Sequence, residues 1–316
     1  MSKATRQAFG ESLAEWGGKR NEIVVLDADL AKSTRSELFM KKFPDRFFEM
    51  GISEANMIGV AAGLSFIGKI PFLCSFGCFL TGRYDTIRLS VAYSGANVRL
   101  VGTHAGVGIG DDGHSQMGLE DITLMRALPT MGVFQPMDAR ETELVMNHLV
   151  EKWVGPAYLR LTRQVLPTLL TNEKEWAPEK IYRVKASSKG MGKGNATVLL
   201  IGTGAGTAEA MKAAEILENA GIRTTVLNAH CLKPFDEKGL NQYIGGHSVI
   251  ATVEDHSVIG GLGSCVAETL VHHAERPKFM KFGVQDLFGE SGEPVELYDQ
   301  HGISGAKVAE KIRQAL

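Results

Sequence analysis

The sequence predicts an α/β protein made of two doubly wound domains with parallel sheets. Short apolar runs alternate with amphipathic stretches from start to finish, which is the pattern of parallel strands linked by crossover helices. The length of 316 residues is about twice that of a common domain, so two compact units are expected. A polar, irregular stretch at 171–194 separates an N-terminal series of elements from a smaller C-terminal series.

The first domain is expected to comprise residues 1–170 and to bind the pyrimidine ring of a cofactor, for the reason given below. Its predicted helix at 55–66 carries small and apolar residues on nearly every side. Such a helix is expected to be buried all round, in a core or at a subunit interface. The apolar runs that predict the strands are 22–26, 46–50, 70–75, 98–103, 132–135 and 157–161.

The second domain is expected to comprise residues 195–316. The preceding stretch, 171–194, is rich in polar residues and then in glycine, a composition typical of a linker. The alternation then resumes in shorter form. Strands are predicted at 196–202, 223–228, 248–253 and 278–282, and helices at 208–220, 263–273 and 306–316.

Composition and charge exclude several classes of protein. A net charge of −2 provides no field that would attract nucleic acid or an anionic membrane surface. The most apolar stretch, 57–80, is interrupted by Lys69 and Pro71, and the N-terminus has no secretory signal pattern. The four cysteines form no disulfide framework, which favours reduced thiols in a cytoplasmic protein. We therefore expect a cytoplasmic protein with a small-molecule ligand and without a metal site of its own.

A glycine-rich turn at 202–207 raises the hypothesis of dinucleotide binding, because it follows a predicted strand and opens a helix. The third glycine of the dinucleotide motif would fall at Thr207, and 227–230 lacks the acidic residue expected on a ribose. The sequence therefore favours a tight strand-to-helix turn here.

Glu54 lies between the end of a predicted strand and the start of the apolar helix. A carboxylate in that position commonly stabilises the helix N-terminus. It also fits a buried acid that shares a proton with a heterocycle in a dry site. The spacing alone leaves both interpretations open.

The segment 103–116 is a polar loop with several glycines directly after a predicted strand. Glycines let the backbone approach a ligand closely, and His104, Asp112 and Gln116 supply donors and acceptors. Adjacent carboxylates at 111 and 112 are common in turns, which disfavours a metal site formed by this loop alone. Arg6, Ser33 and Arg163 also lie near the ends of predicted elements, where ligand crevices of α/β proteins form.

Together these residues resemble the C-terminal portion of transketolase, which comprises its pyrimidine-binding and C-terminal domains. The resemblance covers nearly the whole chain. The matching motifs are, in order, Ala4-Thr5-Arg6, Asp27-Ala28-Asp29-Leu30 with Ser33, Gly51-Ile52-Ser53-Glu54, Ser75-Phe76 with Phe79, Thr103-His104 through Gly113, Leu161-Thr162-Arg163-Gln164, and Val253-Glu254-Asp255-His256 with Gly260-Gly261-Leu262-Gly263.

The resemblance implies an enzyme that uses thiamine diphosphate to transfer a two-carbon ketol unit from a ketose to an aldose. Glu54 would then bond a ring nitrogen of the cofactor's aminopyrimidine and activate it. Phe76 and Phe79 would pack the pyrimidine ring, and Asp29 would also contact the cofactor. The substrate-binding residues implied by the resemblance are Arg6, Ser33, His104, Asp112, Gln116 and Arg163, of which His104 and Asp112 are also expected to take part in catalysis.

Two positions depart from the family pattern. Gln116 stands where transketolases usually have a histidine that contacts the substrate, and Gly82 stands where a third aromatic residue at the pyrimidine is common. Standard pentose phosphates are therefore not the only expected substrates. A modified sugar phosphate, or a sulfonated sugar, is consistent with the same anion-binding residues.

The diphosphate and metal motif of thiamine enzymes, Gly-Asp-Gly followed by an asparagine pair, does not occur in this sequence. We therefore expect a separate N-terminal transketolase subunit to hold the diphosphate and its Mg²⁺ or Ca²⁺, in a heterotetramer. The alternatives are the beta subunit of a 2-oxoacid dehydrogenase, which Arg6 and Arg163 disfavour, and a non-catalytic regulatory subunit of the same fold.

Overall fold

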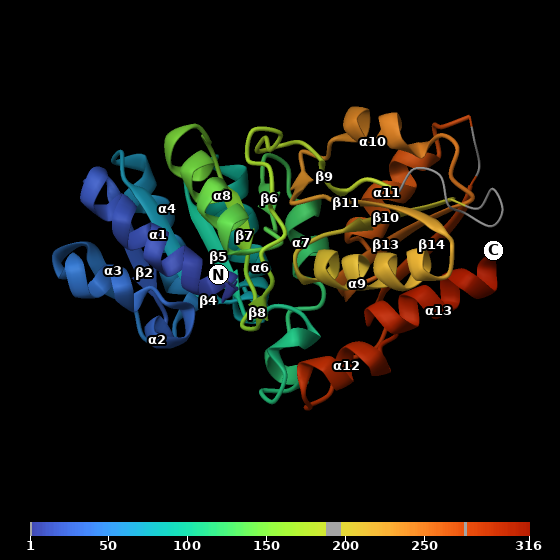
Figure 1. Cartoon of the computed structure of the whole chain (residues 1–316). Helices are drawn as coiled ribbons and strands as arrows, with labels where there is room; N and C mark the ends of the chain where they lie inside the picture. The colour runs from blue at the N-terminus through green and yellow to red at the C-terminus, as the bar shows by residue number, and fades with distance from the viewer. Residues whose placement is uncertain (1, 188–196, 275–276) are drawn as a thin grey trace.

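The protein is described by a computed structural model, which covers residues 2–187, 197–274 and 277–316. Two α/β domains lie side by side, and Figure 1 shows the first in blue to green and the second in yellow to red. The predicted fold class is confirmed.

The first domain contains most of a seven-stranded sheet with the order β12-β6-β7-β5-β4-β2-β3. All strands of this sheet are parallel except β12, which comes from the second half of the chain and pairs antiparallel with β6. The predicted strands of this domain are confirmed to within two residues. Their bounds are β2 Ile23–Asp27, β3 Phe47–Glu49, β4 Ile70–Phe76, β5 Arg99–Thr103, β6 Gly132–Phe134 and β7 Ala157–Arg160, and β12 is Cys231–Lys233.

Helices cover both faces of this sheet. On one face, α1 (Thr5–Lys19) packs beside α8 (Ala139–Glu151) over a core that includes Phe9 and Phe72. On the other face, α4 (Glu54–Phe66), η2 (Ile87–Tyr93) and α7 (Asp121–Ala127) enclose a second core. Burial on both faces explains why β2, β4 and β5 are buried at every residue and are mostly apolar.

The prediction that the helix at 55–66 is buried all round is wrong for the single chain. Met57, Ile58 and Ala61 are buried against the sheet, whereas Val60 and Phe66 are exposed. A helix on an open sheet contacts the layer beneath it with one face only, and none of the described residues forms a further layer over the outer face of α4. The alternative part of the prediction, a subunit interface, stays a prediction.

The second domain has a five-stranded sheet with the order β14-β13-β10-β11-β9, in which only β9 is antiparallel to its neighbour. Figure 1 shows α9 (Ala205–Asn219) and α13 (Gly305–Ala315) side by side. The helix α11 (Leu262–Leu270) contacts β13 and β14 of the sheet. The strand bounds are β9 Tyr182–Lys185, β10 Thr197–Gly202, β11 Arg223–Asn228, β13 Val249–Ser257 and β14 Lys278–Val284.

The structure differs from the predicted linker at 171–194. Residues Tyr182–Lys185 within it form β9, and Tyr182 is buried. This strand is too short, and too polar, to stand out in the sequence, so only pairing with β11 defines it. Positions 188–194 lie outside the described residues.

The two domains are joined by more than the chain connection. Besides the pairing of β12 with β6, the buried Glu141 of α8 accepts hydrogen bonds from Asn228 at 2.9 and 3.0 Å and from Trp176 at 2.9 Å. The second domain therefore has a fixed position against the end of the first.

None of the helices in the described part of the chain combines the length and apolarity that a bilayer span requires. In the described ranges, no cluster of three or more histidine, cysteine or carboxylate side chains is arranged to hold a metal ion.

Candidate functional site

The carboxyl ends of β2, β3, β4, β5 and β7 meet at one edge of the sheet, because these strands are parallel. This is the edge at which open α/β sheets bind ligands. The predicted site residues mostly follow these strand ends: Asp29 and Ser33 after β2, Glu54 after β3, Phe76 and Phe79 at the end of β4, His104 after β5 and Arg163 after β7.

Arg6 and Arg163 are brought together by a two-stranded sheet that the sequence did not predict. In it, β1 (Lys3–Ala4) pairs antiparallel with β8 (Val165–Leu166). The Thr5 hydroxyl also accepts a hydrogen bond from the Thr162 amide at 2.8 Å. Both arginines consequently line one pocket of about 310 Å³, together with part of the glycine loop.

Arg6 links the turn after β2 to the turn after β5. One guanidinium nitrogen, Nη1, donates to the Ser33 carbonyl at 2.8 Å and to His104 Nε2 at 2.7 Å. Because arginine only donates, Nε2 of His104 accepts, and the ring proton is on Nδ1, which donates to the Thr103 hydroxyl at 2.8 Å. Ser33 therefore contributes its backbone carbonyl to this cluster.

The cluster is strongly positive. Burial, Arg35 and Arg163 lower the pKa of Arg6 to about 10, and Asp112 opposes that shift. Burial and the charges of Arg6, Arg163 and Arg35 lower the pKa of His104 to about 3. The charges of three arginines thus converge at His104, and such a concentration of positive charge suits the binding of a doubly charged anion. Arg35 was missed in the sequence, where nothing distinguishes it; in the structure it has the left-handed φ of 70°.

His104 is expected to stay uncharged between pH 5 and 8. In the folded chain its ring NMR signals should not titrate over this interval, whereas in denaturant they should titrate near 6.5. The unfolded state binds the proton first, so this residue's contribution to stability is lost as pH falls from 6.5 toward 3. His104→Gln should therefore lose less stability than the wild type over that interval. A titration of the folded ring near pH 6.5 would contradict the prediction.

An aromatic surface adjoins the arginine cluster. The ring of Phe76 stacks on Phe79, with centroids 5.4 Å apart, and on His104, with centroids 3.9 Å apart. Phe79 lies on the short helix α5 (Gly77–Thr81), directly after β4. The predicted cofactor aromatics and the predicted substrate histidine are thus contiguous, and their faces suit a flat heteroaromatic ring.

Glu54 is the first residue of α4 and is only 6% exposed. Among the residues that the structure describes, its carboxylate has no hydrogen-bond or ion-pair partner, and no side chain caps this helix. A carboxylate without a partner is free to accept a hydrogen bond. A protonated ring nitrogen would supply the donor, so this residue fits the pyrimidine of thiamine diphosphate.

The turn before α4 is tied to the turn after β2. The Glu49 carboxylate accepts from the Asp29 amide at 2.8 Å and from the Gly51 amide at 3.0 Å. Asp29 has a left-handed φ of 62°, and its side chain is exposed. The pairing fixes Asp29 and Glu54 on neighbouring turns of the same edge.

Asp112 and Gln116 occupy the outer part of the glycine loop. Asp112 lies 3.5 Å from Arg163 Nη1, so it joins the cluster. Gln116 ends the 3₁₀ turn η4 (His114–Gln116), and its carbonyl accepts from the Cys78 thiol at 3.1 Å. In the described part of the chain, Gln116 forms no hydrogen bond to the arginine cluster.

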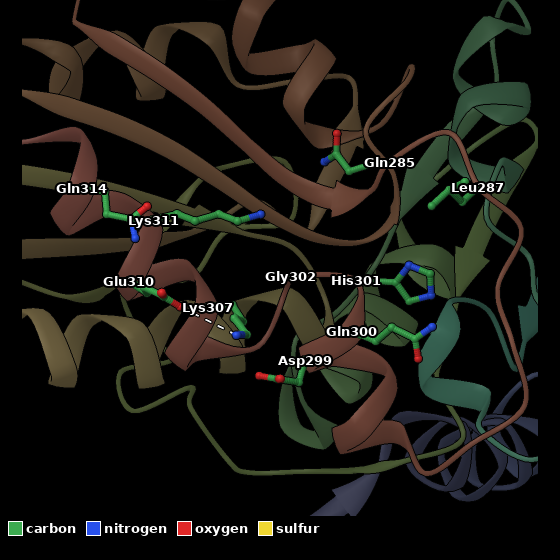
Figure 2. Close-up of a pocket in the computed structure, with 10 residues that line it drawn as sticks. All are labelled: Gln285, Leu287, Asp299, Gln300, His301, Gly302, Lys307, Glu310, Lys311 and Gln314. Atoms are coloured by element: carbon green, nitrogen blue, oxygen red, sulfur yellow. Dashed lines mark ion pairs between the residues drawn. The ribbon is translucent and has the colours of Figure 1, made fainter.

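A separate pocket of about 440 Å³ lies in the second domain (Figure 2). It is formed by the end of β14 and by the helices α12 (Pro294–Gln300) and α13. Lys307 and Glu310 form an ion pair of 3.8 Å at its wall, and Asp299 and Lys311 add opposite charges. This balance of charge provides no preference for an anion, and none of the predicted site residues lines it.

Comparison with known proteins identifies both domains. Residues 1–168 match the family described as transketolase, pyrimidine binding domain, and residues 191–308 match transketolase, C-terminal domain. A putative transketolase C-terminal section of Methanocaldococcus jannaschii is 40% identical over 320 residues, which cover 99% of this chain and 96% of that protein. A 6-deoxy-6-sulfo-D-fructose transketolase subunit of Clostridium sp. (strain MSTE9) is 37% identical over 96% of this chain and 91% of its own length.

Longer relatives and solved structures agree with this match. Human transketolase is 35% identical over 98% of this chain, which corresponds to 48% of the human protein. The structure of a split gene transketolase in an inactive β4 tetramer superposes with a TM-score of 0.86 at 39% identity, covering 100% of this chain and 99% of that chain. A Pichia stipitis transketolase solved with sedoheptulose-7-phosphate, at 24% identity and a TM-score of 0.82, shares the fold over 46% of its length.

Proposed function

The chain belongs to the transketolase family of thiamine-diphosphate-dependent enzymes, as the part that carries the pyrimidine-binding and C-terminal domains, and from this premise we propose how it acts. It transfers a two-carbon ketol unit from an anionic ketose to an aldose. A separate N-terminal subunit holds the cofactor's diphosphate and a divalent metal, Mg²⁺ or Ca²⁺, in a heterotetramer. One observation carries this proposal: the arginine cluster, the aromatic pair and the unpaired Glu54 lie along one sheet edge.

Thiamine diphosphate supplies the electron sink that lets a carbon–carbon bond beside a carbonyl break. The chain's own residues do the rest. Glu54 holds a proton at the ring nitrogen, and Phe76 and Phe79 orient the ring and exclude water from it. Arg6 and Arg163 bind the anionic end of the sugar, which fixes the reacting carbons near the cofactor.

His104 and Asp112 are proposed to contact sugar hydroxyls. His104 is neutral, and its Nε2 accepts a hydrogen bond from Arg6. When Arg6 turns to a bound anion, the same nitrogen is free to accept from a hydroxyl group. Asp112, whose Oδ1 lies 3.5 Å from Arg163 Nη1, would accept from another hydroxyl of the sugar.

The anionic end of the sugar is a phosphate or a sulfonate. Both are tetrahedral groups that arginine forks bind through paired oxygens. The subunit from Clostridium sp. is named for a sulfonated fructose, and it shares 37% of its residues with this chain. Gln116 stands where transketolases usually have a histidine that contacts the substrate, which is a second reason to test sugars with a phosphate and sugars with a sulfonate.

The N-terminal subunit is proposed to cover the outer face of α4. This helix packs against η2, and both expose large apolar side chains. Exposed apolar surface of this kind is typical of a subunit interface. Docking there would close the site around Glu54, which begins the same helix. The exposed apolar residues of α4, η2 and their flanks are Ile52, Val60, Phe66, Ile67, Leu89 and Tyr93.

Val60→Lys is expected to weaken assembly with the N-terminal subunit by at least about tenfold, because a desolvated, unpaired charge is costly at an interface. Ile216→Lys is the matched control, since Val60 is 37% and Ile216 is 39% exposed and both are on helices. Titration followed by sedimentation measures the effect. Equal affinity of the two variants would place the interface elsewhere.

Without its partner, the chain is proposed to form an inactive assembly of its own copies through the same apolar face. The structure of the split gene transketolase in an inactive β4 tetramer supports this. Val60→Lys should then also lower the mass of the chain measured alone by light scattering.

The chain is proposed to act in the cytoplasm. All four cysteines are free thiols, and Cys74, Cys231 and Cys265 are buried. Reduced, unpaired cysteines are the normal state of a cytoplasmic protein.

Co-expression with the N-terminal subunit tests the function. The assembled pair should transfer a ketol unit from ketose phosphates or from 6-deoxy-6-sulfofructose to an aldose, and neither chain alone should do so. Decarboxylation of 2-oxoacids without ketol transfer would instead support a dehydrogenase beta subunit. A pair that binds but accelerates neither reaction would support a regulatory subunit.

A further inference from the structure

A buried carboxylate of the second domain holds the glycine loop of the first. Asp255, near the end of β13, is 1% exposed. Its Oδ1 accepts from the Val107 amide at 2.7 Å, and its Oδ2 accepts from the Gly108 amide at 3.1 Å. Both amides belong to the 3₁₀ turn η3 (Val107–Ile109), next to the anion-binding pocket. The contact therefore joins the second domain to the substrate loop.

Two glycines make this contact possible. A Cβ on Gly106 would lie 2.2 Å from Asp255 Oδ2, and Gly106 also has a φ of +90°. A Cβ on Gly108 would lie 2.6 Å from Gln164 Nε2 and 2.8 Å from the Tyr298 hydroxyl. The glycines of this loop are thus required where the second domain approaches the backbone.

Tyr298 extends the same contact. It lies in α12, which Figure 1 shows against the teal segment that contains η3. Its hydroxyl donates to Asp255 Oδ2 at 2.8 Å and accepts from the Gln164 amide group. Tyr298 and Asp255 therefore hold two first-domain segments at once, the η3 turn and the residue after Arg163.

Both segments are connected to Arg163, one by a hydrogen bond and the other along the chain. The Ile109 carbonyl, at the end of η3, accepts from Arg163 Nη1 at 2.8 Å, and Gln164 is the next residue along the chain. We propose that the C-terminal domain positions the anion-binding guanidinium of Arg163, with Asp255 and Tyr298 as the positioning residues. This inference rests on the proposed function and assigns a task in substrate binding to the second domain.

Asp255→Asn and Tyr298→Phe in the assembled enzyme test the inference. Asparagine offers one acceptor oxygen instead of two, so one of the two loop amides loses its partner. KM for a donor with an anionic end should rise about tenfold, while kcat changes less than about twofold. KM for an uncharged donor should not change, because Arg163 has no anion to bind in it.

Tyr182→Phe is the matched control, because it also removes the hydroxyl of a buried second-domain tyrosine, one that accepts from the Asn172 amide at 3.1 Å. It should leave KM for both donors unchanged. Equal losses with charged and uncharged donors in Asp255→Asn and Tyr298→Phe would mean that these residues only maintain the fold, and unchanged KM for both donors would also overturn the inference.

A second measurement separates this inference from the proposed function. In the chain alone, hydrogen exchange at the Val107 and Gly108 amides should be at least about tenfold faster in Asp255→Asn than in the wild type. Binding of inorganic phosphate, followed at the Arg163 side chain by NMR, should weaken in the same variant. Failure of the wild-type pair to transfer a ketol unit would refute the proposed function, whereas unaltered exchange and phosphate binding would refute the positioning role.

Discussion

Glu54→Ala is expected to reduce ketol transfer by the assembled enzyme by about 10²–10⁴-fold, because the cofactor ring loses the group that holds its proton. Glu54 is 6% exposed, and no partner within the described chain uses its carboxylate. Its removal therefore breaks no contact of the fold, and the free energy of unfolding should change by no more than about 1 kcal/mol. Initial rates at saturating cofactor measure the loss.

Two controls separate the catalytic role of Glu54 from helix stabilisation. Glu237→Ala removes a first-turn carboxylate from α10 (Glu237–Ile244) in the second domain, and it should leave the rate unchanged. Glu54→Gln keeps the size of the side chain but removes the acid, so its rate should be as low as that of the alanine variant. Near-normal turnover in Glu54→Ala, with assembly intact, would reduce this residue to a helix-stabilising carboxylate.

Arg163→Ala is expected to raise KM for a donor with an anionic end about 10- to 100-fold, which is the effect of losing charge-assisted hydrogen bonds. KM for an uncharged donor should stay within about twofold. The Arg163 side chain is 38% exposed, and its guanidinium contacts the Ile109 carbonyl and Asp112. The fold should therefore tolerate the change. Steady-state kinetics with matched charged and uncharged donors measure the difference.

Arg6→Ala should also raise KM for the charged donor and leave KM for the uncharged donor nearly unchanged. Because both residues bind one anion, the loss of binding free energy in the double variant should be smaller than the sum of the losses in the single variants. Arg313→Ala, at an exposed position of α13, is the control for loss of positive charge. A uniform rise in KM for charged and uncharged donors would show that the arginines act on loop structure and not on the anion.

The predicted strands of both domains, and the helices at 55–66, 208–220, 263–273 and 306–316, were recognisable in the sequence because most of them bury an apolar run or face. The exception is β3, which has no buried residue. The short strands β1, β8, β9 and β12 were not recognisable. They contain two to four residues and few apolar ones, so their pairing partners define them. These are also the strands that bring distant parts of the chain together.

The site divides in the same way. The acidic, aromatic and basic residues were identified from ordered local motifs, and the parallel sheet made their shared edge foreseeable. The sequence carried no sign of Arg35, which adds to the charge at His104, or of the hydrogen bonds from Arg6 to His104 and to the Ser33 carbonyl. Such contacts depend on turns whose backbone angles only the packed structure defines.

By itself, then, the sequence determined the two-domain α/β architecture and the identity of the candidate cofactor and substrate residues, and it predicted a second subunit. The tertiary structure decided which face of α4 is exposed, how β1 and β8 bring Arg6 beside Arg163, and how Asp255 reaches the glycine loop. The physical reason is the separation along the chain of the residues that interact. Apolar periodicity and local motifs act over a few neighbouring residues, whereas these contacts join residues more than 140 positions apart, and only the folded chain brings them within hydrogen-bonding distance.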